Sequence, residues 1–228
     1  MATRVLSNDH VESAYERWAP FYDAAFEWVM GYGRKAVAAE VNKFDGRVLD
    51  VGIGTGLELP MFKRDIDLVG VDLSESMLEI ARKRVAEFGL THVEALLVMD
   101  ALNLQFPDDS FDTVVAPYVL TVVPNPHLLL DELSRVVKPG GAIILVNHIG
   151  AASGPVAWIE ALFGMISHWL GWNPQFPWSI VGDWLAKRPD IELLERRPVA
   201  PIKLFTLIRM RRRNPGEAAG SPLSAANP

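Results

Sequence analysis

The chain has no cysteine among its 228 residues, and this absence narrows the chemistry open to it. Disulfides and thiolate catalysis are excluded, and a zinc site would lack its commonest ligand. The histidines show no spacing typical of a metal site: His10, His92, His127, His148 and His168. The sequence therefore predicts a protein without a bound metal.

Long apolar runs are also lacking, since no uninterrupted stretch approaches the roughly 20 residues that span a bilayer. Residues 1–9 are polar, and no apolar segment with a cleavage site follows them. We therefore expect no signal peptide and a cytoplasmic location.

An excess of positive charge is absent as well. The formal net charge of −6 and the pI of about 5.4 argue against a nucleic-acid-binding protein, which usually has a basic face. Basic residues nevertheless gather near the C-terminus: Lys187, Arg188, Arg196, Arg197, Lys203, Arg209, Arg211, Arg212 and Arg213. Two interpretations remain open, namely a basic strand edge with a solvated tail, or attraction to an anionic phospholipid surface.

What the sequence does contain is a glycine-rich loop directly after an apolar stretch. Residues 48–56 read Val-Leu-Asp-Val-Gly-Ile-Gly-Thr-Gly. Glycine permits a positive φ and lets backbone N–H groups approach a bound molecule closely. The spacing G-x-G-x-G differs from the dinucleotide-binding pattern G-x-G-x-x-G. The pattern predicts a buried strand that leads into a ligand-binding turn.

Three later apolar stretches, each predicted to be a strand, lead into polar or turn-forming residues: 68–72 into Asp72, 93–99 into Asp100 and Ala101, and 111–116 into Pro117. Ser74 is a good N-cap for a helix after the second stretch. A fifth strand is expected at 142–147, after the helix-breaking residues 137–141. Because ligands of open α/β sheets bind at the carboxyl ends of the strands, we expect these residues to share one site.

Together with Asp50, the glycine loop resembles the first motif of class I S-adenosylmethionine-dependent methyltransferases. The resemblance implies a Rossmann-like α/β fold with a seven-stranded, mostly parallel sheet flanked by helices, and S-adenosylmethionine as the cofactor. The residues implied to bind the cofactor are Asp50, Gly52, Ile53, Gly54, Thr55, Gly56, Asp72, Leu73, Met77, Asp100, Ala101 and Pro117. The alternative for the three aspartates is that each only caps the following helix or turn. For Asp112, inside a strand start, we expect a structural role.

We expect one methyltransferase domain over residues 1–213 and a disordered tail over 214–228, which is rich in proline, glycine, alanine and serine. Residues 8–44 are expected to form an aromatic helical lid. Residues 151–187 are expected to form a helical insertion after the fifth strand that holds five of the seven tryptophans: Trp158, Trp169, Trp172, Trp178 and Trp184. Core packing and contact with lipid both explain such a segment, and we favour contact with lipid.

The similarity becomes specific over residues 13–209. The segments 15–23, 48–60, 93–100, 111–126 and 146–148 resemble the soluble bacterial phosphatidylethanolamine N-methyltransferases. The family is implied to transfer methyl groups stepwise from S-adenosylmethionine to the ethanolamine headgroup, which leads to phosphatidylcholine. The resemblance thus implies phosphatidylethanolamine as the substrate. From the amphipathic lid and the scattered basic residues we expect an enzyme held peripherally at the inner face of the membrane, where anionic lipids favour binding.

The ethanolamine amine, with a pKa of about 10, must lose a proton before it can accept a methyl group. We expect His148, at the tip of the fifth strand, to be the base or proton relay. The alternative is a buried, hydrogen-bonded histidine. Tyr22 and Tyr118 are expected to flank the amine. Further residues expected to bind the substrate are Tyr15, Arg17, Trp18, Asn147 and Lys187. For the lipid phosphate the sequence leaves four cations unranked: Arg17, Arg34, Lys35 and Lys187.

Two other functions remain open at this point. A quinone-type C-methyltransferase would use the same cofactor motifs on a carbon acceptor, with His148 as the base. A non-catalytic module that binds the cofactor and associates with membranes would need no acceptor chemistry.

Overall fold

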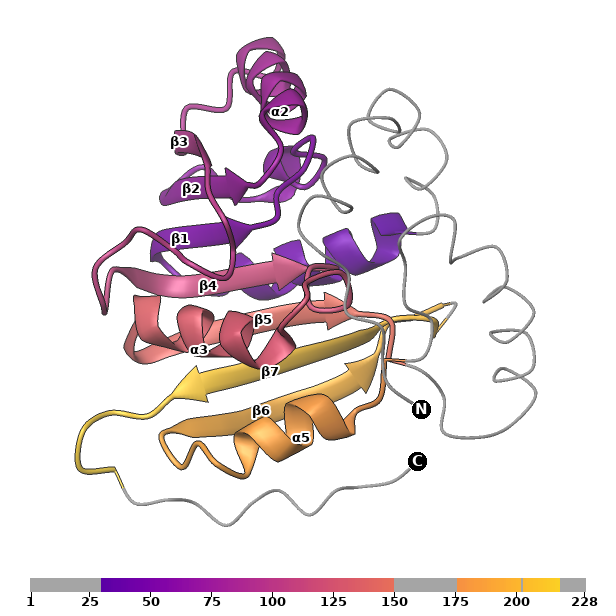
Figure 1. Ribbon diagram of the computed structural model, residues 1–228. Coiled ribbons are helices and arrows are strands. Elements are labelled where there is room, and N and C mark those ends of the chain that lie inside the picture. The colour runs from indigo at the N-terminus through magenta and orange to yellow at the C-terminus, as the bar shows by residue number, and fades with distance from the viewer. Residues whose placement is uncertain (1–29, 150–175, 202, 218–228) are drawn as a thin grey trace.

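The structure is a computed structural model that describes residues 30–149, 176–201 and 203–217 (Figure 1). Four predicted substrate residues, Tyr15, Arg17, Trp18 and Tyr22, lie outside the described residues. The same holds for residues 8–29 of the expected lid and 151–175 of the expected insertion, including Trp158, Trp169 and Trp172.

Seven strands form one sheet in the order β3-β2-β1-β4-β5-β7-β6. Strands β1 to β5 run parallel to one another, whereas β7 is antiparallel to both β5 and β6. This confirms the predicted α/β architecture with a mostly parallel, seven-stranded sheet. The strands are β1 (Gly46–Val51), β2 (Ile66–Asp72), β3 (Val93–Val98), β4 (Phe111–Pro117), β5 (Val137–Asn147), β6 (Ile191–Pro198) and β7 (Thr206–Arg212).

Helices cover both faces of the sheet, as the apolar character of the buried parallel strands requires. On one face, α3 (Pro126–Val136) and α5 (Ser179–Leu185) pack over β4, β5, β7 and β6 (Figure 1). On the other, a helix over residues 30–41 buries Val37 and Val41 against Val115 and Val146. The short 3-10 helix η1 (Leu59–Met61) and α2 (Glu75–Glu87) complete the described helices. Leu59 and Leu78 belong to the second core as well.

Local signals in the sequence explain where the helices begin. The Ser74 hydroxyl accepts a hydrogen bond from the Met77 N–H at the start of α2, which confirms the predicted N-cap. The Asn125 side chain caps α3 in the same way, with Pro126 in its first turn. Because parallel strands need a crossover, each cap sits near the carboxyl edge of the sheet, where the chain leaves a strand. The caps therefore help to shape that edge.

Parts of the expected lid and insertion that the structure describes belong to the scaffold. Trp184 is buried in the core beside α3, and its indole N–H donates to Asp131. Trp178 stacks against the Arg196 guanidinium, 4.0 Å from the ring centroid. Trp184 therefore belongs to the core, whereas Trp178 is half-buried against it. Within the described residues, no helix is both long and apolar enough to cross a bilayer.

The first four residues of the predicted tail are among those that the structure describes. Residues 214–217 form a turn in which the Glu217 N–H donates to the Asn214 carbonyl. The Glu217 carboxylate forms an ion pair with Arg211 on β7. The tail predicted to begin at residue 214 is thus held to the sheet through residue 217.

Candidate functional site

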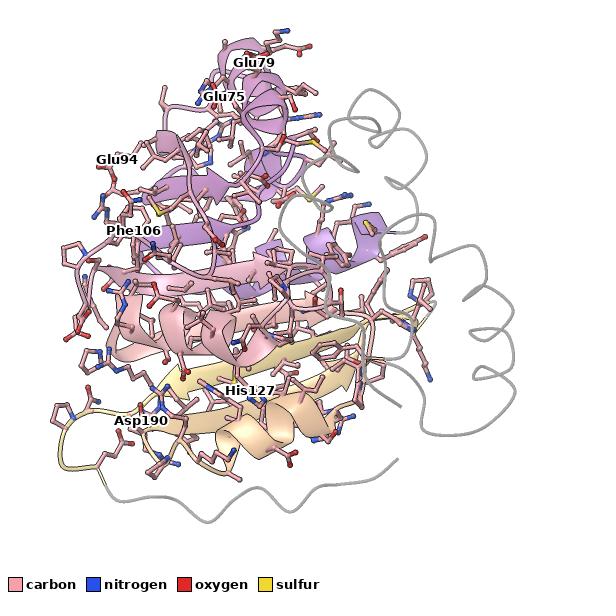
Figure 2. All side chains as sticks on the ribbon, viewed as in Figure 1. Glu75, Glu79, Glu94, Phe106, His127 and Asp190 are labelled. Carbon is pink, nitrogen blue, oxygen red and sulfur yellow. The ribbon has the colours of Figure 1, made fainter. Side chains whose placement is uncertain are left out.

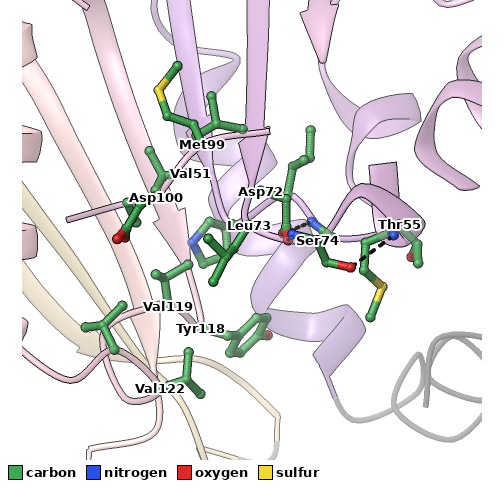
Figure 3. A pocket seen from close by; sticks show the side chains of 18 of the residues that line it. Val51, Thr55, Asp72, Leu73, Ser74, Met99, Asp100, Tyr118, Val119 and Val122 are labelled. Carbon is green, nitrogen blue, oxygen red and sulfur yellow. Dashed lines mark hydrogen bonds between the residues drawn. The ribbon is translucent and has the colours of Figure 1, made fainter. Parts of the chain in front are cut away.

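A pocket opens at the carboxyl edge of the parallel strands, between the loops that follow β1, β2, β3 and β4 (Figure 3). Its empty volume, with the open mouth included, is about 1010 Å³. Ten of the predicted cofactor residues line it: Gly52, Ile53, Gly54, Thr55, Asp72, Leu73, Met77, Asp100, Ala101 and Pro117. The structure therefore brings together residues that the sequence spreads over more than 60 positions.

The glycine loop after β1 forms the floor of the pocket. Gly52 has φ +72°, and a Cβ there would lie 2.2 Å from a methyl carbon of Val119. Its N–H donates to the Val71 carbonyl, which ties the loop to β2. Only glycine allows this left-handed conformation and this close approach of the β4 loop at once.

Asp72, at the tip of β2, organises the loop. One carboxylate oxygen accepts from the Gly54 N–H at 2.7 Å and the other from the Ser74 N–H at 2.9 Å. Burial raises the pKa of Asp72, although these backbone donors oppose the shift. A carboxylate has about four lone-pair sites, so the two bonds leave room for ligand hydroxyls. The capping role and the ligand-binding role predicted for Asp72 are thus compatible.

Asp100 behaves similarly at the end of β3. Its carboxylate accepts from the Leu102 N–H at 2.8 Å, and the side chain lines the pocket. Figure 3 shows Asp100 and Asp72 on separate strand ends, with Leu73 between them. This arrangement places carboxylates along the half of the pocket that β2 and β3 form.

Tyr118 lies at the other end of the pocket, directly after β4. It has φ +66°, and its hydroxyl donates to the Met30 carbonyl at 2.6 Å. Its ring packs edge-to-face on Phe205, with the centroids 5.0 Å apart. Gly33 leaves space for the hydroxyl, because a Cβ there would lie 1.9 Å from it. The predicted amine-flanking residue is therefore fixed in place and lines the pocket.

Beneath the glycine loop lies a buried group of charges. Asp50 is fully buried, and neither carboxylate oxygen has a hydrogen-bond partner among the described residues. Burial, reinforced by the negative charges of Glu58 and Asp72, raises its pKa well above the ordinary value. Glu58 is also buried, and its pKa is raised by burial against the opposing charge of Arg34, 3.5 Å away. Unlike Asp50, both Glu58 and Arg34 line the pocket.

Five predicted residues have a different place from the pocket wall. Gly56 packs on Leu59 and Ala81, and Asp50 lies beneath the loop. Asn147 and His148, at the end of β5, are buried but are not among the residues that line the pocket. Lys187 is exposed between α5 and β6.

The place of Lys187 corrects its predicted role. Since β6 runs parallel to β5, its first residue lies at the amino edge of the sheet, opposite the pocket. Figure 2 labels Asp190 at that edge, next to the start of β6. Lys187 precedes Asp190 in the chain, so it cannot contact a ligand held beside Tyr118.

For the basic residues near the C-terminus, the sequence left two interpretations open. Carboxylates form ion pairs with six of the arginines: Arg188, Arg197, Arg209, Arg211, Arg212 and Arg213. Arg196 stacks on Trp178. Most of this positive charge is therefore neutralised within the fold, which supports the interpretation as a strand edge.

Comparison with known proteins settles the family. Residues 49–145 match the model of a family described as a methyltransferase domain. The chain is 42% identical over 205 residues to a phosphatidylethanolamine N-methyltransferase from Cereibacter sphaeroides, and the match covers 90% of this chain and 98% of that protein. The chain belongs to the phosphatidylethanolamine N-methyltransferase family. It is thus a class I, S-adenosylmethionine-dependent methyltransferase, as the motifs predicted.

Two further comparisons set this methyltransferase in a wider group. It is 32% identical to a demethylmenaquinone methyltransferase from Symbiobacterium thermophilum, over 75% of this chain and 70% of that one. A solved S-adenosylmethionine-dependent methyltransferase from Thermotoga maritima superposes with a TM-score of 0.64 at 24% identity, over 88% of this chain and 99% of that one. The structural likeness supports the fold alone.

The residues present fit S-adenosylmethionine. The Gly52 cradle and the Asp72 carboxylate with lone pairs to spare suit a nucleoside with a charged side chain. The part of the chain that the structure describes holds no group of three His, Asp or Glu side chains placed to bind a metal ion.

Sequence reasoning missed two kinds of residue in this site. Glu58 was not predicted, although it follows the glycine loop by two positions, because its burial depends on packing by distant segments. The apolar wall after β4, formed by Val119, Val122 and Val123, reads in the sequence as ordinary core. Their position after a strand that ends at the ligand edge was the available signal.

Proposed function

We propose that this methyltransferase methylates the amine of phosphatidylethanolamine and of its mono- and dimethyl derivatives, which leads to phosphatidylcholine. The observation that carries the proposal is the 42% identity to a phosphatidylethanolamine N-methyltransferase over almost the full length of both chains. We further propose that the reaction takes place at the inner surface of the cytoplasmic membrane. Residues 8–44 and 151–187 would then select the acceptor around a single methyltransferase domain.

When bound, S-adenosylmethionine supplies a methyl group on a positively charged sulfur and leaves as S-adenosylhomocysteine. The chain has to hold the acceptor amine in its neutral form, in line with that methyl group. Tyr118 is suited to this task, because its hydroxyl and ring lie at the pocket and its rotamer is fixed by Met30 and Phe205. A tyrosine ring also favours the methylammonium that forms. Tyr22, Tyr15 and Trp18 are proposed to complete this aromatic enclosure.

His148 is proposed to accept the proton that the amine loses. The His148 ring nitrogen Nδ1 lies 2.8 Å from the Leu204 carbonyl, which can only accept a hydrogen bond. In the neutral ring Nδ1 therefore carries the hydrogen, and Nε2 can accept a proton. Because His148 does not line the pocket, transfer through an intervening group is required. Asn147 is proposed to orient that group, and Arg17 to hold the lipid phosphate.

The decisive test is incubation with labelled S-adenosylmethionine and mixed micelles that contain phosphatidylethanolamine, its monomethyl form, its dimethyl form or a demethylated quinol. Labelled methylated phospholipid is expected. Label in the quinol alone would overturn the proposal in favour of a C-methyltransferase, an alternative that the demethylmenaquinone methyltransferase relative keeps in view.

A matched pair of variants tests the base. His148→Gln is expected to lower kcat, because the variant lacks a ring nitrogen that can accept the proton. His127→Gln is the control, because His127 bonds to the Ile180 carbonyl between α3 and α5, away from the pocket. A kcat in His148→Gln as high as in His127→Gln would exclude His148 as the proton acceptor.

A further inference from the structure

The charges that line the pocket are unequally distributed along it. Among the described residues of the wall, the carboxylates of Asp72 and Asp100 follow β2 and β3, whereas Arg34 is the one cation. Arg34 belongs to the helix over residues 30–41, whose Gly33 touches Tyr118 after β4. Because β1 separates β2 from β4 in the sheet, Arg34 and Glu58 lie at the end remote from Asp100.

Arg34 and Glu58 are both buried, with side chains 5% exposed. Their contact is a single approach of Arg34 Nε to one Glu58 oxygen at 3.5 Å, which is longer than a good charge-assisted hydrogen bond. A guanidinium has five N–H donors, and Glu58 is the partner that the structure records for it among the described residues. A buried ion pair with such incomplete hydrogen bonding is poorly compensated for the loss of water. Its donors and acceptor are therefore available for a ligand in the pocket.

The ligand chemistry that fits this pair is an α-amino acid. An α-carboxylate can take two parallel N–H donors from Arg34, and an α-ammonium can donate to Glu58, so each charge finds an opposite one. S-adenosylmethionine has such a group at the end opposite its nucleoside. We infer that Arg34 and Glu58 form the subsite that binds the amino-acid group of the cofactor, with Arg34 on the carboxylate and Glu58 on the ammonium. The inference deepens the proposed function. It rests on S-adenosylmethionine as the cofactor and does not depend on which acceptor is methylated.

This assignment differs from the other role open to Arg34, that of a partner for the lipid phosphate. Both ligands are anions, but a phosphate of a bilayer lipid would have to reach a guanidinium that is almost fully buried beside the glycine loop. The cofactor enters that loop as part of its normal binding. Burial therefore favours the cofactor carboxylate.

The affinities for two probes distinguish the contribution of the amino-acid group from that of the rest of the cofactor. S-adenosylhomocysteine has the nucleoside, the sulfur and the amino-acid group, whereas 5′-methylthioadenosine has the first two only. Calorimetry with each probe would be performed on the wild type, Arg34→Gln, Arg34→Lys and Glu58→Gln. We expect Arg34→Gln to weaken S-adenosylhomocysteine at least about tenfold and to leave 5′-methylthioadenosine unchanged. Arg34→Lys should be intermediate, because it keeps the charge and loses the two parallel donors.

Asp72→Asn is the matched control, because it should weaken both probes by a similar factor. Retained binding of 5′-methylthioadenosine also shows that each variant still folds its pocket. Equal loss of both probes in Arg34→Gln, or loss of neither, would overturn the inference. So would an unchanged affinity for S-adenosylhomocysteine with a raised KM for lipid, which would assign Arg34 to the phosphate. If lipid methylation were absent while the probe difference held, the proposed function would fail and the inference would stand.

Discussion

The carboxylates at the pocket and those beside β6 and β7 are the same chemical groups in opposite surroundings. At the pocket, burial raises the pKa of Asp50, Glu58 and Asp72. Beside β6 and β7, burial also raises the pKa of Glu40, but Lys43, Arg197 and Arg209 outweigh it, and the pKa lies below its ordinary value. The carboxylates at the pocket have too few cationic partners. Those beside β6 and β7 are neutralised by nearby cations. A ligand that brings positive charge is thus favoured at the pocket alone.

The largest effect is expected from Gly52→Ala at the pocket. The new Cβ would collide with Val119 and would also occupy a positive φ, so we expect S-adenosylhomocysteine binding to fall more than about 100-fold. Gly89→Ala is the control, since Gly89 has φ +55° and no atom lies within 4 Å of the place that its Cβ would take. It shares the backbone strain of about 1–2 kcal/mol but not the collision. Equal affinities in the two variants would show that the cradle is not needed.

Beside β6 and β7, Glu40→Gln is expected to lower the free energy of unfolding by about 1–3 kcal/mol at neutral pH, because Arg197 and Arg209 lose a buried partner. Since the pKa of Glu40 is lowered by folding, its contribution is present above the unfolded-state pKa of about 4.3. It is lost as the pH falls through the folded-state value.

Denaturant unfolding of the wild type and Glu40→Gln from pH 7 to pH 3 measures this difference. Glu75→Gln is the control, because the Glu75–Arg82 pair on α2 is exposed to solvent and should contribute little. A difference that grew on acidification would contradict the assigned direction of the Glu40 shift.

Asp50→Asn tests the opposite sign at the pocket. Because folding raises the pKa of Asp50, the cofactor-free protein loses stability as the pH rises from the unfolded-state pKa of about 3.9 towards the folded-state value. The asparagine does not titrate, so the variant does not suffer this loss. The Tm of the variant minus that of the wild type should therefore be about 2–4 °C higher at pH 8 than at pH 5. Asp112→Asn should show no such trend between pH 5 and pH 8, because Lys138 and the Arg47 N–H hold the pKa of Asp112 low against burial, and the contribution of a carboxylate with a lowered pKa changes only below about pH 4. Parallel trends would refute the contrast.

The smallest effect concerns the membrane proposal. Lys203 lies in the loop between β6 and β7 at the pocket edge, and Lys187 lies at the opposite edge; both are exposed. If the pocket edge faces an anionic bilayer, Lys203→Gln should weaken binding to vesicles with phosphatidylserine by up to about fivefold, while Lys187→Gln should change it little. Co-sedimentation measures both. A larger loss in Lys187→Gln would reverse the proposed orientation.

The fold, and the meeting of the predicted cofactor residues at one edge of the sheet, could be predicted from the sequence because their signals are local. Each predicted strand is found, and the glycine loop, Asp72 and Asp100 each follow a strand in the chain and meet at one edge because the strands are parallel. Asp112 also has the expected structural role, accepting from the Arg47 N–H and from Lys138.

The roles of the charged residues in space could not be predicted in the same way. Pairing of Arg209 with Glu40 joins β7 to the helix over residues 30–41, and pairing of Arg212 with Asp109 joins segments on either side of β5. No spacing in one sequence reveals such contacts. Lys187 was wrongly assigned for the same reason, since its edge depends on the direction of β6.

The contact between Gly33 and Tyr118 has a consequence for protein engineering. With a Cβ position 1.9 Å from the tyrosine hydroxyl, the two sites are sterically linked across 85 residues of chain. A library that varies position 33 alone would sample mainly variants in which the aromatic ring is displaced. Larger residues at position 33 become accessible when position 118 is shortened in the same clone, so the pair is a single design variable for reshaping the Tyr118 end of the pocket.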